Sequence, residues 1–115
     1  MKTKSEVWTY DQSLEANQAS WVGYHVHATD GDIGKIDEMT TETGRGSLVV
    51  DTGPWIFGKK RLIPASSVRS VDHEEERVTV SLTKEQIKNA PDCDATRLDD
   101  YSYYDEQGTY YGPFI

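Results

Sequence analysis

Two histidines separated by one residue are the clearest candidates for chemistry in this chain. His25 and His27 lie in the alternating segment 22–28, so both imidazoles face the same side of a predicted strand. Two such imidazoles can hold zinc when a third ligand joins them, and Asp37 or Glu38 across the predicted hairpin could supply it. Alternation also explains the pair without a metal, because a half-buried strand needs polar residues on its outer face. No third histidine or cysteine pair has metal-ligand spacing, so we expect no metal and no other cofactor.

The only cysteine lies in surroundings that disfavour nucleophilic catalysis. Cys93 is flanked by Asp92 and Asp94, and neighbouring carboxylates raise the pKa of a thiol, which leaves less of the reactive thiolate. The serines lack the glycine-flanked turn of a nucleophile elbow, and the chain has no glycine-rich phosphate loop. The sequence therefore predicts a protein that is not an enzyme.

A run of three large apolar residues lies in a glycine-flanked loop. Trp55, Ile56 and Phe57 follow one another there, immediately before a basic triplet at residues 59–61. Burying one large apolar side chain is worth roughly 2–3 kcal/mol, so three of them in water would be unfavourable. Either the loop closes one end of the predicted fold, or it contacts a partner. A strand places neighbouring basic residues on opposite faces, so the triplet is weak evidence for a phosphate ligand.

Aromatic and acidic residues are interleaved in the C-terminal tail, residues 92–115. The tail shows no clear period. Tyrosine and tryptophan anchor interfaces because they bury much area for few rotatable bonds. We therefore expect the loop and the tail to bind a protein partner, or a second copy in a C2 homodimer. The predicted partner-binding residues are Trp55, Ile56, Phe57, Tyr103, Tyr104, Tyr110, Tyr111 and Phe114. The alternative is a tail that folds back over its own domain.

Short strands with tight turns are predicted between residues 21 and 82. Segments 22–28 and 33–39 form a predicted hairpin, because Asp30-Gly31 is typical of a tight turn that needs positive φ. Further strands are predicted at 47–51, 60–63 and 78–82, and a bend between Val68 and Val71. About six short strands predict a mostly β fold, a small antiparallel barrel, since closure removes exposed strand edges.

A short helix and two terminal segments complete the predicted organisation. Thr83 and Gln86 form a capping box that predicts a helix over residues 83–89, and Pro91 fixes its exit. Residues 1–20 are a predicted arm, either a loose leader with one anchoring tryptophan or a segment with two turns of helix capped by Asp11. The chain is thus divided into an arm (1–20), one domain with its terminal helix (21–91) and the acidic, tyrosine-rich tail (92–115).

The composition restricts the partners and the compartment. The 115 residues carry a formal net charge of −8, and such a surface repels phosphate backbones and anionic lipid headgroups, so we do not expect nucleic acid to bind. One cysteine allows no internal disulfide, which fits a reducing compartment. No apolar run approaches the roughly 20 residues that span a bilayer, and none follows the basic first residues. We expect a cytoplasmic protein without membrane insertion, and leave peripheral association with a membrane complex open.

Several motifs occur in an order that resembles a known family. They are Gly23, Val26, Asp30-Gly31-Asp32-Ile33-Gly34-Lys35-Ile36, Leu48-Val49-Val50-Asp51-Thr52-Gly53, Trp55, and residues 59–64, 78–82 and 83–91. This order resembles the PRC-barrel family, named for the cytoplasmic domain of the photosynthetic reaction centre H subunit. The resemblance covers roughly residues 20–95. It implies a small β-barrel with no family-wide catalytic residue.

The resemblance implies alternative functions. In the H subunit the domain caps the reaction centre and influences electron and proton transfer at the quinone site, so a module associated with photosynthetic electron transport is one alternative. The family also resembles the C-terminal domain of a ribosome maturation factor, so a role in RNA processing or ribosome assembly is another. A ligand-binding barrel is disfavoured, because side chains such as Leu48, Val50 and Ile63 are enough to fill a small barrel. We favour a non-catalytic adaptor or assembly module that binds a protein partner or itself.

Overall fold

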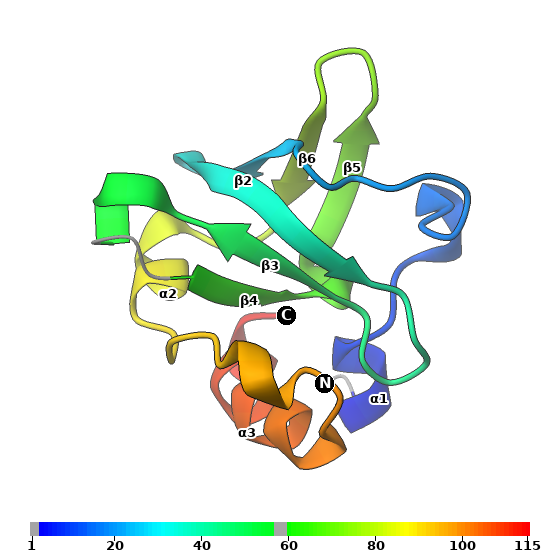
Figure 1. Ribbon diagram of the computed structural model, residues 1–115, viewed down its shortest axis with the longest axis vertical. Coiled ribbons are helices and arrows are strands. Elements are labelled where there is room, and N and C mark those ends of the chain that lie inside the picture. Colours follow the sequence, from blue (N-terminus) through cyan, green and yellow to red (C-terminus); the bar gives the residue numbers. More distant parts are fainter. Residues whose placement is uncertain (1–2, 57–59) are drawn as a thin grey trace.

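The computed structural model describes residues 3–56 and 60–115 (Figure 1). Within this part of the chain one sheet contains the strands, in the order β4-β3-β2-β1-β6-β5. The strands are β1 (His25–Ala28), β2 (Gly31–Thr40), β3 (Ser47–Asp51), β4 (Lys60–Pro64), β5 (Val68–Asp72) and β6 (Arg77–Val80). Neighbouring strands are antiparallel except β1 and β6, which run parallel. The predicted mostly β fold of about six short strands is confirmed.

The predicted closure into an antiparallel barrel is wrong. β4 and β5 lie at opposite ends of the strand order, so the sheet of the described residues is open. Pro64 ends β4, and the buried 3-10 turn η3 (Ala65–Ser67) leads directly into β5. The turn joins the two strands end to end, which prevents them from pairing side by side through this connection. β6 then returns along β5 and meets β1 in the same direction, which explains the parallel pair.

The first hairpin is confirmed, and Asp30, which precedes Gly31, is part of its turn. Ala28 pairs with Gly31, so Thr29 and Asp30 form the turn and Gly31 takes a φ of 148°. Asp30 Oδ1 accepts a hydrogen bond of 2.8 Å from the backbone N–H of Lys84. The hairpin turn therefore also binds the first residue of the helix α2 (Lys84–Lys88).

Gly34 allows two strands to approach each other closely. Its φ is 140°, and a Cβ at this position would lie only 2.1 Å from the carbonyl oxygen of Asp51 on β3. An L-residue is disfavoured at such a φ, and no side chain fits in that space. The glycines of the motif at residues 30–36 therefore have specific backbone roles.

Helices at both ends of the chain pack beside each other against the sheet (Figure 1). The predicted capping box of α2 is confirmed, with Thr83 and Gln86 exchanging hydrogen bonds. The tail, for which no period was predicted, forms α3 (Tyr101–Tyr111), flanked by the 3-10 turns η4 (Ala95–Arg97) and η5 (Gly112–Phe114). The arm contains α1 (Lys4–Val7) and η1 (Gln12–Leu14). Asp11 caps η1 as predicted, but the predicted two-turn helix is limited to this short turn.

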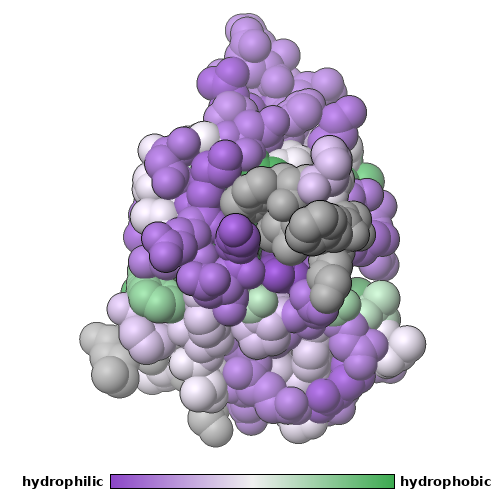
Figure 2. Space-filling model, turned by 90° about the vertical axis from the view of Figure 1, so that its left-hand side faces the viewer, coloured by the Kyte–Doolittle hydropathy of each residue, from purple (hydrophilic) through white to green (hydrophobic). Residues whose placement is uncertain are grey.

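The core lies between the sheet and the terminal segments. Trp21, Leu48, Ile63 and Leu82 are fully buried. Trp8 of the arm contacts Tyr104 of α3 edge to face, with ring centroids 5.0 Å apart. Arm, sheet and tail thus contribute to one core. No helix among the described residues is long and apolar enough to cross a membrane, and the face in Figure 2 is mainly hydrophilic.

Candidate protein-interaction surfaces

Most of the tail tyrosines predicted to bind a partner pack inside the chain itself. Tyr103, Tyr104 and Tyr111 are buried, and Tyr104 is only 1% exposed. Its hydroxyl donates to the carbonyl oxygen of Leu98 over 2.7 Å. In a helix, residues 103, 104, 107 and 111 share one face, and in α3 that face is turned toward the sheet. These three residues therefore cannot act as exposed anchors in this structure, which has the tail folded over its own domain.

The remaining predicted tail residues lie near the end of α3. Tyr110 is half-buried and its hydroxyl donates to the carbonyl oxygen of Gln86. The ring of Phe114 lies 5.4 Å from that of Tyr110 and stays partly exposed. The most exposed tail aromatic is Tyr101, at 59%, which the sequence reasoning did not select. Tyr101 is the first residue of α3 and follows the N-cap Asp100. This position in the sequence could have distinguished it from the tyrosines on the buried face of the helix.

That the apolar loop of Trp55, Ile56 and Phe57 contacts a partner stays a prediction. Trp55 and Ile56 end the 3-10 turn η2 (Gly53–Ile56) that follows β3. Phe57 lies outside the described residues. Both interpretations of the loop, as a plug or as a partner contact, therefore remain.

Two of the basic residues beside the loop, Lys60 and Arg61, make contacts within the chain. Lys60 pairs with Asp37, and this carboxylate raises the pKa of the lysine. Arg61 is 4% exposed, and its Nε and Nη2 donate to the carbonyl oxygens of Ile87 and Lys88, each over 3.0 Å. Its Nη1 lies 2.6 Å from Oδ1 of Asp92. Arg61 thus fixes the end of α2 and the start of the tail to β4.

The two candidate metal ligands lie on β1 as predicted. His25 Nδ1 is 3.5 Å from Oδ2 of Asp32 on the paired strand. Asp37, one of the carboxylates considered as a third ligand, instead pairs with Lys60. Among the described residues no group of three histidine, cysteine or acidic side chains could hold a metal ion. Both histidines are half-buried, a position that polar residues on the outer face of a strand also take.

Cys93 positions the tail along β4. Its backbone N–H donates to the carbonyl oxygen of Lys60 over 3.0 Å. Burial raises the pKa of the Cys93 thiol, and a hydrogen bond with Tyr103 opposes this only in part. The raised pKa favours the protonated thiol, as the sequence also indicated, although burial rather than the neighbouring carboxylates is the main cause.

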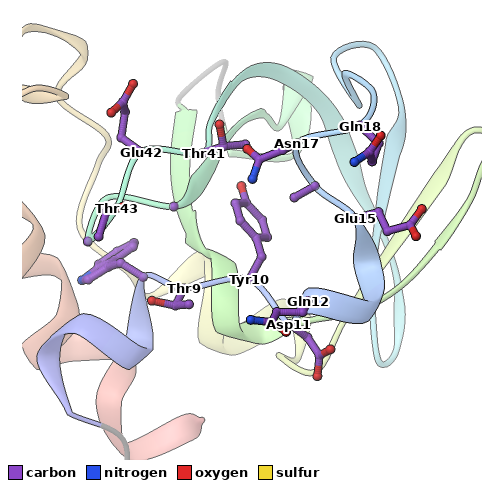
Figure 3. A pocket seen from close by; sticks show the side chains of 14 residues that line it. Thr9, Tyr10, Asp11, Gln12, Glu15, Asn17, Gln18, Thr41, Glu42 and Thr43 are labelled. Carbon is purple, nitrogen blue, oxygen red and sulfur yellow. The ribbon is translucent and has the colours of Figure 1, made fainter.

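A groove of about 340 Å³ lies where the arm crosses the turn between β2 and β3 (Figure 3). The Tyr10 side chain extends along it, and its hydroxyl lies 3.1 Å from the carbonyl oxygen of Thr40 and 3.0 Å from that of Ser47. Burial raises the pKa of Tyr10, which keeps this hydroxyl protonated as a donor. The other labelled side chains are Thr9, Asp11, Gln12, Glu15, Asn17, Gln18, Thr41, Glu42 and Thr43. Tyr10 thus joins the arm to the sheet at this groove.

The two ends of the sheet differ in how far they are covered. β4 is buried from Arg61 to Pro64, and the segment containing Cys93 runs along it. At the other end β5 pairs with β6, and Arg69, Ser70 and Asp72 are exposed. A strand at the edge of a sheet presents N–H and C=O groups that another strand can bind. The outer edge of β5 is therefore the candidate interaction surface, and the strand order that creates it was not visible in the sequence.

No family model matches this chain, and no curated protein matches it. The PRC-barrel resemblance therefore rests on the order of the motifs. Two residues of the motif at positions 30–36 have physical roles in the fold, because Asp30 binds the start of α2 and Gly34 lies against β3.

Proposed function

We propose that this protein is a non-catalytic adaptor with a PRC-barrel-like sheet, which binds a protein partner along the outer edge of β5. The observation that supports this most directly is the difference between the ends of the sheet. Three of the five residues of β5 are exposed, whereas four of the five residues of β4 are buried. Backbone pairing at an open edge gives affinity, and alternate side chains give specificity.

The position of the hairpin supports the same surface. Figure 1 shows the β5–β6 hairpin projecting from the rest of the molecule. Val68 at the start of β5 is buried, whereas Val71 is half-buried. The strand is thus held in the sheet at its start and reaches solvent toward the hairpin tip. An added strand would contact a preformed backbone, which lowers the entropy cost of binding.

The proposal is tested by crosslinking followed by hydrogen exchange. A photoreactive amino acid is placed at Ser70, and a matched control carries it at Thr109, an exposed position on α3. A protein crosslinked at position 70 and not at position 109 is identified by mass spectrometry, purified and bound to the unmodified chain. We expect the backbone amides of β5 to exchange more slowly in the complex, while those of α2 stay unchanged. Protection confined to other segments would show that the partner binds elsewhere.

A further inference from the structure

We infer that the groove between the arm and the turn after β2 binds an extended peptide segment that carries lysine or arginine. This inference goes beyond the proposed function, because no residue of β5 lines the groove. The length of the groove, the polar groups that line it and their charges each support such an occupant.

The groove continues along the arm beyond the part drawn in Figure 3. The hollow of about 340 Å³ adjoins a second one of about 370 Å³, which is lined by residues 16–20 together with Met39 and Thr41. The two hollows share four lining residues, Ala16, Asn17, Gln18 and Thr41. Ligand sites have volumes of about 300–1,000 Å³. A site of this size that follows a chain segment suits an extended ligand better than a compact one.

Both walls of the groove are held by hydrogen bonds within the chain. On the arm, the backbone N–H of Gln18 donates to the carbonyl oxygen of Glu15 over 2.9 Å. On the turn, the backbone N–H of Arg45 donates to the carbonyl oxygen of Glu42 over 3.0 Å. The hydroxyl of Tyr10 joins the two walls through the sheet. A site that is already formed loses less conformational entropy when its ligand binds.

Amide and hydroxyl groups in the groove match the polar groups of a peptide backbone. Figure 3 shows the side chains of Asn17 and Thr41 at the hydroxyl end of Tyr10. Within the described part of the chain, the side chains of Asn17, Gln18 and Thr41 form no hydrogen bond. An amide side chain can donate to a peptide carbonyl oxygen and accept from a peptide N–H group at the same time. These groups can therefore hold an extended backbone whatever side chains it carries.

The charged side chains that line the groove are all acidic. They are Asp11, Glu15 and Glu42, and none of the lining residues, all within the described part of the chain, is lysine, arginine or histidine. Glu42 lies 3.9 Å from Arg45, whereas the side chain of Glu15 forms no ion pair among the described residues. Glu15 and Glu42 lie on opposite sides of the groove (Figure 3). Basic side chains of a bound segment would therefore meet a carboxylate on either side, and the net charge of −8 attracts such a segment.

Titration of the full chain with short acetylated peptides, followed by heteronuclear NMR, tests the inference. Lysine alternates with threonine in the first peptide, and glutamine or glutamate replaces every lysine in two control peptides. We expect the lysine peptide to shift the side-chain amide signals of Asn17 and Gln18 until they saturate. Its dissociation constant should be about 0.1–1 mM, because the contact is smaller than a stable interface. The glutamine peptide should bind more weakly, and the glutamate peptide should not bind.

Substitutions in the groove separate the contacts to charge from the contacts to the backbone. Glu15→Gln combined with Glu42→Gln should weaken binding of the lysine peptide about 3- to 10-fold and leave the glutamine peptide unchanged. Asn17→Ala should weaken binding of both peptides, because its amide contacts the backbone that they share. Glu74→Gln combined with Glu75→Gln makes the same charge change on the exposed turn after β5 and should leave both affinities unchanged.

The melting temperature of each variant shows whether it is folded, and Asn17→Ser takes the place of Asn17→Ala if the latter is not. The inference is overturned if ~5 mM lysine peptide gives no saturating shift, or if the shifts are confined to residues outside the groove. Folded groove variants that bind as tightly as the original chain would also overturn it. An equal loss of affinity in the Glu74 and Glu75 variant would show that net charge alone attracts the peptide. None of these results bears on the β5 edge, which the crosslinking at Ser70 tests.

Discussion

Replacing Gly34 by alanine tests the close approach of β2 and β3. The new Cβ would lie 2.1 Å from the carbonyl oxygen of Asp51, so the strands would have to separate by about 0.9 Å to reach the 3.0 Å below which real Cβ contacts are essentially absent. Such overpacking costs about 1–3 kcal/mol. The φ of 140° adds about 1–2 kcal/mol for an L-residue. We therefore expect the free energy of unfolding to fall by about 2–5 kcal/mol, a large part of the ~5–15 kcal/mol of a typical domain.

Urea denaturation followed by tryptophan fluorescence measures this change, and two other glycines provide controls. Gly23 has a φ of 91° with no atom within 4 Å of the added Cβ, so Gly23→Ala should show the backbone cost alone, about 1–2 kcal/mol. Gly112 has a φ of −46° and equally open space, so Gly112→Ala should be neutral or slightly stabilising. If Gly34→Ala and Gly23→Ala agree within ~0.5 kcal/mol, the steric part of the reasoning is refuted.

Three further substitutions test the buried polar groups. Arg61→Met should lower the free energy of unfolding by about 2–4 kcal/mol and speed amide exchange in α2, because the carbonyl oxygens in the last turn of α2 lose their donors. A decrease in the free energy of unfolding below ~1 kcal/mol would contradict this role of Arg61. Tyr111→Phe should be neutral or stabilising at pH 7, since its buried hydroxyl has no hydrogen-bond partner among the described residues, whereas Tyr104→Phe should cost ~1 kcal/mol. Burial raises the pKa of Tyr111 above its usual value of 10, so the folded chain keeps a proton that the unfolded chain releases, and stability is lost as the pH rises above 10. Tyr111→Phe should reduce that loss by about 1.4 kcal/mol per pH unit. If the free energy of unfolding falls equally steeply above about pH 10 in the original chain and in Tyr111→Phe, the buried Tyr111 is not the cause of the loss.

Local features of the fold could be predicted from the sequence because they depend on residues close together in the chain. The capping box of Thr83 and Gln86 and the turn before Gly31 need only a few neighbouring residues, and both are present. The helix α3 was missed although its spacing was present, since Tyr103, Gln107 and Tyr111 follow at intervals of four. Acidic and exposed aromatic residues between them, such as Tyr101, obscured the period.

The arrangement of the strands was decided only by the tertiary structure. The alternation of apolar and polar residues shows that β1 and β6 each have a buried face. This alternation is the same in parallel and antiparallel pairs, so it does not show which strands are neighbours or in which direction they pair. In the fold, His25 pairs with Arg77, far along the chain, and the turn after Pro64 places β5 at an open end. The same is true of the candidate surface. Arg69 and Asp72 are ordinary charged residues in the sequence, and they form an exposed edge only because the strands pair in this order.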